Sequence, residues 1–265
     1  MLASVLQQPP CSTETKVVTT RLWGKQSYVG GPTLTTNRRT LILGIGNILW
    51  ADEGFGVRAA ESLHRNWDFD ESVTIMDGGT QGIYLLQHVE QADILVIFDA
   101  IDYGLAPATL KLVEGNAVPN YMGAKKVSLH QTGFQEVLAM AEMLGRLPEH
   151  MLLVGVQPVQ IEDFGGSLHS KVREQIGPAA TAAVEWLAEH GVNSTRLPAP
   201  HPNRESIAGD EIDMMRYESL RPTEDEACRV GDDRVLNSDR FEVGYRSQPL
   251  DPGAVSVDVD HRGKY

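Results

Sequence analysis

The chain has 265 residues, of which 42% are hydrophobic, and a formal net charge of −13 at pH 7. Residues 41–191 carry eight Lys or Arg against twenty Asp or Glu. This acidic centre argues against a nucleic acid partner, because phosphates bind to basic surfaces. No apolar run approaches the ~20 residues of a membrane-spanning helix, so we expect no membrane insertion.

The ends of the chain differ in composition from its centre. Residues 1–39 are rich in Gln, Pro, Thr and Gly and lack the basic and apolar regions of a signal peptide. We predict a disordered N-terminal arm there, apart from a short strand at Lys16–Thr20. Cys11 and Cys228 are too few for a disulfide framework or a cysteine metal site, so we expect a reducing, cytoplasmic setting.

From Thr40 to Gly191, apolar runs alternate with amphipathic segments. The predicted strands lie near residues 41–43, 73–76, 94–98, 109–113 and 151–156. The predicted helices lie at 57–67 and 82–89, after a capping box at 132–135, and at 171–190, where Pro178 should introduce a kink. The uninterrupted run Ile94–Phe98 is typical of a strand that is buried on both faces.

This alternation predicts an α/β fold. We expect a three-layer sandwich of the phosphorylase/hydrolase-like kind, with a mostly parallel central sheet of about five strands flanked by helices. The predicted domain spans residues 40–192. After Gly191 the chain becomes polar, and we predict that 193–265 is a largely unstructured tail with one short helix near Asp213–Leu220.

The stretch from Leu41 to Gly56, LILGIGNILWADEGFG, leads from the first predicted strand into the first predicted helix. It is compatible with an ordinary turn between strand and helix. A dinucleotide-binding fingerprint would need a third glycine where Leu49 stands, and two carboxylates lie where a pyrophosphate would bind. A third interpretation is that Glu53 holds a metal or takes part in chemistry.

Four polar residues follow predicted strands or lie just ahead of a predicted helix: Glu53, Asp77, Asp99 and His130. Parallel strands open on one edge of a sheet, where ligands bind, so we expect these side chains to converge there. Two carboxylates and an imidazole form an N/O site suited to Ni, Zn or a similar ion. A helix N-terminus near His130 should keep its ring neutral and able to bind a metal.

Other interpretations of these residues remain open. Asp77 lies in Asp-Gly-Gly-Thr, where a turn-forming role is favoured over direct ligation. The sequence contains no G-x-S-x-G elbow, no cysteine in its centre, no H-E-x-x-H and no P-loop. Ser128 and His130 are two residues apart on an extended segment and should not form a nucleophile–base pair.

Several motifs occur in order along the domain. They are G-x-G-N-x-L-x-x-D-E-G-x-G-V (Gly44 to Val57), D-G-G-T (Asp77 to Thr80), D-A-x-D (Asp99 to Asp102), S-x-H-Q (Ser128 to Gln131) and G-V-Q-P (Gly155 to Pro158). Together they resemble the [NiFe]-hydrogenase maturation endopeptidases, from about Thr40 to Val192. The resemblance does not extend to the two ends of the chain.

The resemblance implies an endopeptidase that removes a short C-terminal extension from a hydrogenase large-subunit precursor after nickel insertion. It implies that Glu53, Asp99 and His130 are both the catalytic and the metal-contacting residues, and that Asp77 belongs to a turn and substrate groove. The nickel is carried by the substrate, although other divalent ions could occupy the isolated site. Water would be activated by nickel or by a carboxylate acting as general base.

Two alternatives of other classes follow from the same residues. A non-cleaving, nickel-sensing chaperone of the large subunit would use the same three ligands. An NAD-binding oxidoreductase is disfavoured by the missing glycine, and Asp77 is its only candidate for an acidic residue that binds the nucleotide.

Overall fold

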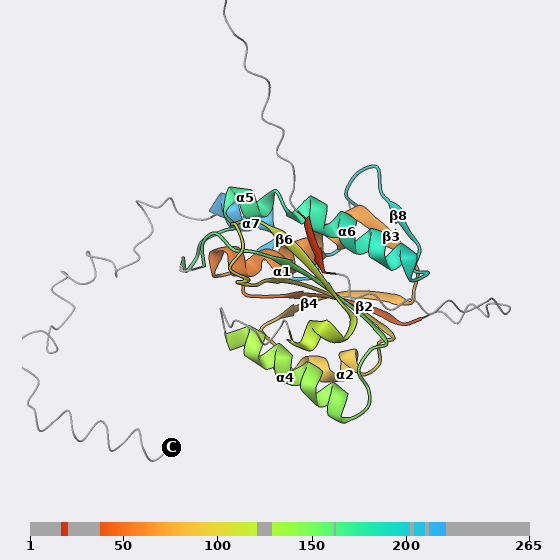
Figure 1. The fold of residues 1–265 in the computed structure, drawn as a ribbon. Helices are drawn as coiled ribbons and strands as arrows, with labels where there is room; N and C mark the ends of the chain where they lie inside the picture. The colour runs from red at the N-terminus through yellow and green to blue at the C-terminus, as the bar shows by residue number, and fades with distance from the viewer. Residues whose placement is uncertain are drawn as a thin grey trace, which may run out of the picture. The chain divides into compact units, whose positions relative to one another are not determined.

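The computed structural model describes residues 17–20, 38–120, 129–161, 163–201, 204–209 and 212–220 (Figure 1). For residues 17–20 and 129–132 only the backbone is described. The chain divides into two units, Met1–Ser219 and Leu220–Tyr265. The strands and helices belong to the first unit, apart from the last residue of the final helix.

A six-stranded sheet forms the centre of the domain, with the strand order β1-β6-β7-β5-β2-β4. Strands β2, β4, β5 and β7 are parallel, β6 is antiparallel to β7, and β1 is parallel to β6. The prediction of a mostly parallel sheet is confirmed. The bounds are β1 (Val17–Thr20), β2 (Thr40–Ile45), β4 (Val73–Gly79), β5 (Ile94–Ala100), β6 (Leu110–Glu114) and β7 (His150–Val156).

Helices cover both faces of this sheet, which confirms the predicted three layers (Figure 1). On one side lie α1 (Phe55–Asn66), α5 (Ser170–Arg173), α6 (Ile176–Glu189) and α7 (Met214–Leu220). On the other lie η2 (Gly82–Leu85), α2 (Leu86–Val89) and α4 (Leu129–Met143). Two short 3₁₀ turns, η1 (Ala51–Gly54) and η3 (Gly115–Ala117), follow β2 and β6.

Alternate residues of the central strands supply two separate cores. Ile42, Val96 and Val154 pack toward α1 and α6, whereas their neighbours along the strands face α2 and α4. This follows from the two-residue period of a strand, whose side chains point alternately to opposite faces. Because both faces are covered, the strands are apolar at nearly every position, as the run Ile94–Phe98 predicted.

The predicted helix at 171–190 is divided into α5 and α6 by a turn at residues 174–175. The kink predicted at Pro178 is therefore wrong. Pro178 lies in the first turn of α6, where the backbone N–H has no partner within the helix and its loss is tolerated. Gly191 follows this helix with a positive φ of 81°, as expected for a residue that ends a helix.

Glycines allow the chain after β2 to fold back against the strand ends. A Cβ at Gly56 would lie 2.1 Å from the carbonyl oxygen of Ile45 and 2.2 Å from that of Phe98. A Cβ at Gly46, whose φ is +136°, would lie 1.9 Å from the carbonyl oxygen of Glu53. The first turn of α1 thus lies directly on β2 and β5, with η1 above the end of β2.

The chain beyond residue 192 begins with ordered structure. Strand β8 (Ser194–Arg196) pairs with β3 (Trp67–Phe69) in a small antiparallel sheet that the sequence did not predict. The helix predicted near Asp213–Leu220 is confirmed as α7. Residues 221–265 of the predicted tail, and the predicted arm apart from 17–20 and 38–39, lie outside the described residues.

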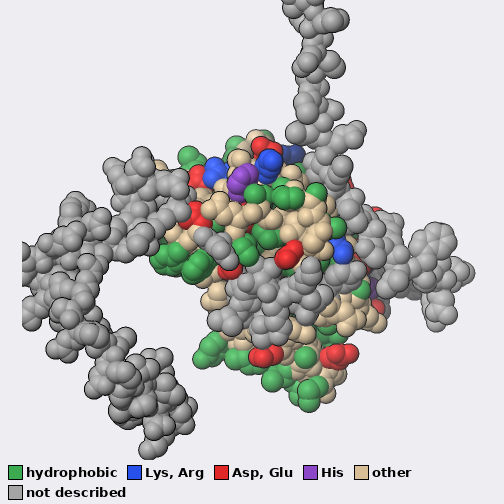
Figure 2. Space-filling model, turned by 60° about the vertical axis from the view of Figure 1, so that its left-hand side comes forward, with side chains coloured by type: hydrophobic (Ala, Val, Ile, Leu, Met, Phe, Trp, Pro, Cys, Tyr) green, Lys and Arg blue, Asp and Glu red, His purple; other side chains and the backbone are tan. Residues whose placement is uncertain are grey.

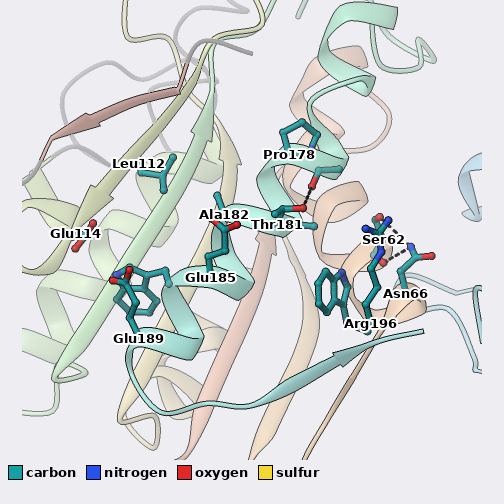
Figure 3. A pocket seen from close by; sticks show the side chains of 14 residues that line it. Ser62, Asn66, Leu112, Glu114, Pro178, Thr181, Ala182, Glu185, Glu189 and Arg196 are labelled. Atoms are coloured by element: carbon teal, nitrogen blue, oxygen red, sulfur yellow. Dashed lines mark hydrogen bonds between the residues drawn. The ribbon is translucent and has the colours of Figure 1, made fainter. Parts of the chain in front are cut away.

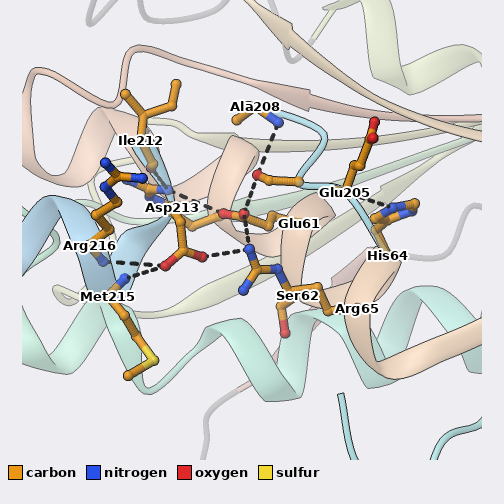
Figure 4. Close-up of polar contacts among 12 residues, drawn as sticks. Glu61, Ser62, His64, Arg65, Glu205, Ala208, Ile212, Asp213, Met215 and Arg216 are labelled. Atoms are coloured by element: carbon orange, nitrogen blue, oxygen red, sulfur yellow. Dashed lines mark hydrogen bonds and ion pairs between the residues drawn. The ribbon is translucent and has the colours of Figure 1, made fainter. Parts of the chain in front are cut away.

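Polar contacts connect residues 204–209 and 212–213 to α1 (Figure 4). Arg58 and Glu61 are 5% and 4% exposed and form an ion pair of 3.1 Å. Arg58 also donates to the carbonyl oxygen of Ile212 at 2.6 Å, and Glu61 accepts from the Ser206 hydroxyl at 2.6 Å. A buried ion pair needs such additional hydrogen bonds to offset its desolvation, and residues 206 and 212 supply them.

Arg204 and Asp213 also contact the C-terminal end of α1. Arg65 pairs with Asp213 at 2.6 Å, and Asp213 also accepts from the backbone N–H groups of Met215 and Arg216 at the start of α7. Arg204 donates to the carbonyl oxygens of His64 and Trp67, where α1 ends. Residues 204–209 and 212–213 are therefore an integral part of the helical layer.

Among the described residues, no helix combines the length and the apolar character needed to cross a lipid bilayer.

The close approach of Gly56 gives a first prediction. We expect Gly56→Ala to lower the free energy of unfolding by at least about 2 kcal/mol, because the new Cβ meets two backbone carbonyls that cannot move independently. Gly177→Ala is the control, since an added Cβ there has no neighbour within 4 Å and the change should stabilise α6 by up to about 1 kcal/mol. Urea unfolding of both variants measures the difference. Equal stabilities would contradict the close approach.

Candidate functional site

Four parallel strands end at one edge of the sheet, on the left in Figure 1. In the register of the sheet, Gly44 of β2 lies beside Asp77 of β4 and Phe98 of β5, and Asp99 lies beside Gly155 of β7. The 3₁₀ turn η1, which carries Glu53, follows β2 at the same edge. The structure therefore brings Glu53, Asp77 and Asp99 to the edge where the sequence predicted them.

Glu53 and Asp99 are both buried. Glu53 is 8% exposed, and its backbone N–H donates to the carbonyl oxygen of Trp50 at 2.9 Å. Asp99 is fully buried near the end of β5, and its carboxylate accepts from the backbone N–H of Ala100 at 2.8 Å. Both carboxylates are thus carried by regular backbone rather than by a long loop, which favours a fixed geometry.

His130 is the second residue of α4. This helix begins at Leu129, so the prediction that it starts at the Thr132 capping box is wrong, and Thr132 lies inside its first turn. Gly133 is close to Gly82, since a Cβ at Gly82 would lie 3.8 Å from the Cα of Gly133. Because Gly82 comes soon after β4, the start of α4 lies near the edge that carries Asp77.

The side chain of His130 lies outside the described residues, as do Ser128 and the rest of 121–128. Among the side chains that the structure describes, no three His, Cys, Asp or Glu groups are arranged to hold a metal ion. The set Glu53, Asp99 and His130 therefore stays a prediction, with two of its members placed at one edge.

Asp77 lies in β4, directly before the two glycines that end this strand. Its carboxylate has a buried oxygen, Oδ1, that makes no hydrogen bond. Burial raises the pKa of the Asp77 carboxyl above its ordinary value, although a backbone hydrogen bond from Gly79 acts in the opposite direction. The turn itself is formed by residues 78–81, where the N–H of Gln81 donates to the carbonyl oxygen of Gly78.

Asp52 is a buried carboxylate whose role the sequence did not reveal. It precedes Glu53, is fully buried, and accepts hydrogen bonds from the backbone N–H groups of Val159, Gln160 and His169. It joins the turn after β2 to the loop after β7. The two neighbouring acidic residues in Asp-Glu-Gly were the only signal for this contact.

Gln157 connects another pair of loops at this edge. Its side-chain oxygen accepts from the backbone N–H groups of Tyr103 and Leu105, and its side-chain nitrogen donates to Asp102. The motifs G-V-Q-P and D-A-x-D, which are about fifty residues apart, therefore form one hydrogen-bonded unit after β5 and β7.

Apolar side chains are exposed on the loops of this edge. Leu49 and Trp50 follow β2, and Val159 and Phe164 follow β7, with exposed fractions from 37% to 66%. The rings of Trp50 and Phe164 meet edge-to-face with centroids 5.3 Å apart. Figure 2, in which the left-hand side of Figure 1 faces the reader, shows hydrophobic side chains and carboxylates together on this face.

A cavity of about 750 Å³ lies elsewhere, around α6 (Figure 3). It is lined by the end of α1, by α6, by β6 and by Arg196 of β8, with Glu114, Glu185 and Glu189 among its polar groups. None of the residues predicted for the site lines it. Its position therefore separates it from the candidate site at the strand ends.

Comparison with known proteins identifies the family. The model of the family described as HycI, hydrogenase maturation protease, matches residues 57–186, a range that includes Asp99 and His130 and begins four residues after Glu53. The hydrogenase expression/formation protein HupD of Thiocapsa roseopersicina is 56% identical over 198 residues, which cover 75% of this chain and 90% of that protein. This chain belongs to the hydrogenase maturation protease family.

Two further relatives extend this assignment to the family fold and its enzyme class. The hydrogenase 2 maturation protease of Escherichia coli K12 is 38% identical over 164 residues, covering 62% of this chain and 99% of that protein. The structure of the hydrogenase maturating endopeptidase HybD from E. coli superposes with a TM-score of 0.57 at 36% identity, covering 63% of this chain and 99% of that one. The resemblance drawn from the motifs is confirmed, and the chain is an endopeptidase of this family.

The raised pKa of Asp77 gives a second prediction. A carboxyl whose pKa is higher in the folded state takes up protons on folding, so its contribution to stability falls as the pH rises above its ordinary pKa. Asp77→Asn removes this titration. We therefore expect the free energy of unfolding of the variant, relative to the unsubstituted protein, to increase from about pH 4 to pH 7.

Urea unfolding at several pH values measures this difference. The exposed Glu142, changed to Gln, is the control for the loss of a surface charge. A difference for Asp77→Asn that stayed constant or decreased with pH would contradict the effect of burial.

Proposed function

We propose that this endopeptidase removes the C-terminal extension of a [NiFe]-hydrogenase large-subunit precursor after nickel has been inserted. Membership of the hydrogenase maturation protease family supports the reaction and the class of substrate. The observation that carries the assignment of the site is the convergence of Glu53, Asp99 and the N-terminal end of α4 at one edge of the sheet. A cytoplasmic setting is part of this proposal.

The chemistry of the donor groups supports recognition of nickel. Two carboxylates and one imidazole supply oxygen and nitrogen ligands without a thiolate, a set suited to borderline divalent ions. In this proposal the nickel belongs to the precursor, and Glu53, Asp99 and His130 complete its coordination when the precursor binds. Cleavage then depends on metal loading, because the scissile bond is held in place only when nickel is present.

Two routes to the attacking water are consistent with these groups. The nickel of the substrate can lower the pKa of a bound water, or one of the carboxylates can accept a proton from it as general base. Asp52 is excluded from the second role, because its two oxygens already accept three backbone hydrogen bonds.

The third prediction concerns two of the proposed ligands. We expect Glu53→Gln and His130→Ala to leave the protein folded and to reduce cleavage of the precursor by at least about 100-fold, because each removes a group that contacts the metal or the water. Glu136→Gln, an exposed position on the same helix as His130, is the control and should cleave normally. Normal processing by either site variant would refute the assignment.

Mass spectrometry of the precursor before and after incubation provides the measurement. Loss of a C-terminal peptide from the nickel-loaded precursor alone supports both the protease and its dependence on nickel. If the nickel-loaded and the nickel-free precursor are both cleaved, the assignment as a protease holds and the dependence on nickel is refuted. Binding without cleavage would instead indicate a nickel-sensing chaperone of the large subunit.

A further inference from the structure

The carboxylate of Asp52 holds together two loops that are far apart in the sequence. Its Oδ2 accepts from the backbone N–H groups of Val159 and Gln160, both at 2.8 Å, and its Oδ1 accepts from that of His169 at 2.7 Å. The backbone N–H of Asp52 donates in turn to the carbonyl oxygen of Gln160 at 3.1 Å. Four hydrogen bonds therefore connect one residue to a single loop more than 100 residues away.

These bonds are stronger than ordinary surface contacts. An ionised acceptor makes shorter and stronger hydrogen bonds than a neutral one, and full burial removes competing water. The donors are backbone groups, so no change of a single side chain in the loop removes them all. The three bonds from Val159, Gln160 and His169 all depend on the side chain of Asp52.

The same two loops also meet at their exposed ends. The backbone N–H of Gly165 donates to the carbonyl oxygen of Leu49 at 2.7 Å, and the rings of Trp50 and Phe164 are in contact. The N–H of Glu53 donates to the carbonyl oxygen of Trp50. Glu53 thus lies on a turn that is held on one side by the loop after β7 and on the other by the close contact with Gly46.

We propose that Asp52 is a positioning residue of the active site. It fixes the backbone of η1, and with it the carboxylate of Glu53, relative to the loop at 159–169. The proposal rests on the proposed function, in which Glu53 contacts the nickel of the precursor. A misplacement of about 1 Å at a reacting group can cost on the order of 100-fold in rate, so a change at Asp52 should lower kcat through Glu53.

The first test compares Asp52→Asn with Glu61→Gln. Both variants remove one buried carboxylate, and Glu61 belongs to the ion-pair network on α1 rather than to the site. Cleavage of the nickel-loaded precursor is measured at a temperature at which circular dichroism shows both variants folded. We expect Asp52→Asn to lower kcat at least about tenfold more than Glu61→Gln does, with KM within about threefold of the unsubstituted enzyme.

The second test removes one hydrogen bond to Asp52 without changing Asp52. His169 has a φ of −56°, which proline can adopt, so His169→Pro deletes the N–H that donates to Oδ1. His169→Ala keeps this N–H and loses the same side chain, and is the matched control. We expect kcat of the proline variant to be at least about threefold lower than that of the alanine variant. This pair decides the matter if Asp52→Asn does not fold.

The outcomes separate this proposal from the proposed function. If the unsubstituted protein does not cleave the nickel-loaded precursor, the proposed function fails. If it does cleave, and Asp52→Asn matches Glu61→Gln or His169→Pro matches His169→Ala, the positioning role is overturned. A change confined to KM would likewise overturn it and would assign the loop to binding of the precursor.

Discussion

The structure depends on one close contact between backbones, that of Gly56 with the carbonyl oxygens of Ile45 and Phe98. This contact presses the first turn of α1 onto the ends of β2 and β5. Because η1 directly precedes α1, this contact also fixes the position of η1 at the edge of the sheet. The position of Glu53, which belongs to η1, is fixed with it. Any side chain at this position would meet these carbonyl oxygens and push the first turn of α1 away from the two strands.

Two adjacent carboxylates at this edge have different surroundings. The buried carboxylate of Asp52 accepts hydrogen bonds from three backbone N–H groups. Glu53 is next to it along the chain, on a turn fixed at both ends. In the proposed function Asp52 holds the backbone and Glu53 contacts the metal, which agrees with the principle that functional groups need supporting contacts around them.

The fold was largely predictable because its strands are buried on both faces. The apolar runs of β5 and β7, and the glycines of the turn after β2, predict a parallel sheet and a sharp return of the chain. The convergence of Glu53, Asp77 and Asp99 then follows from the geometry of parallel strands alone. The location of the candidate site at the strand ends could be predicted from the same geometry, since ligands bind at that edge of a parallel sheet.

Other features could not be predicted from the sequence. Residues 204–209 and 212–213 contact α1 through charged side chains and carbonyl oxygens, as between Arg58 and Ile212, so they show no hydrophobic periodicity. The role of Asp52 depends on backbone groups more than 100 residues away, which no local pattern records. The start of α4 was misplaced because a capping box at Thr132 is also compatible with the interior of a helix.

The attachment of residues 204–209 and 212–213 to α1 has a consequence for the synthesis of the protein. Arg58 donates to Ile212, 154 residues further along the chain. At the usual rates of translation, the ribosome needs on the order of 10 s to make the intervening chain. During that time the charges of α1 that later become buried have no partner from the C-terminal segment. Helix α1 is therefore synthesised early, but it can form its contact with Ile212 only after the ribosome has made that residue.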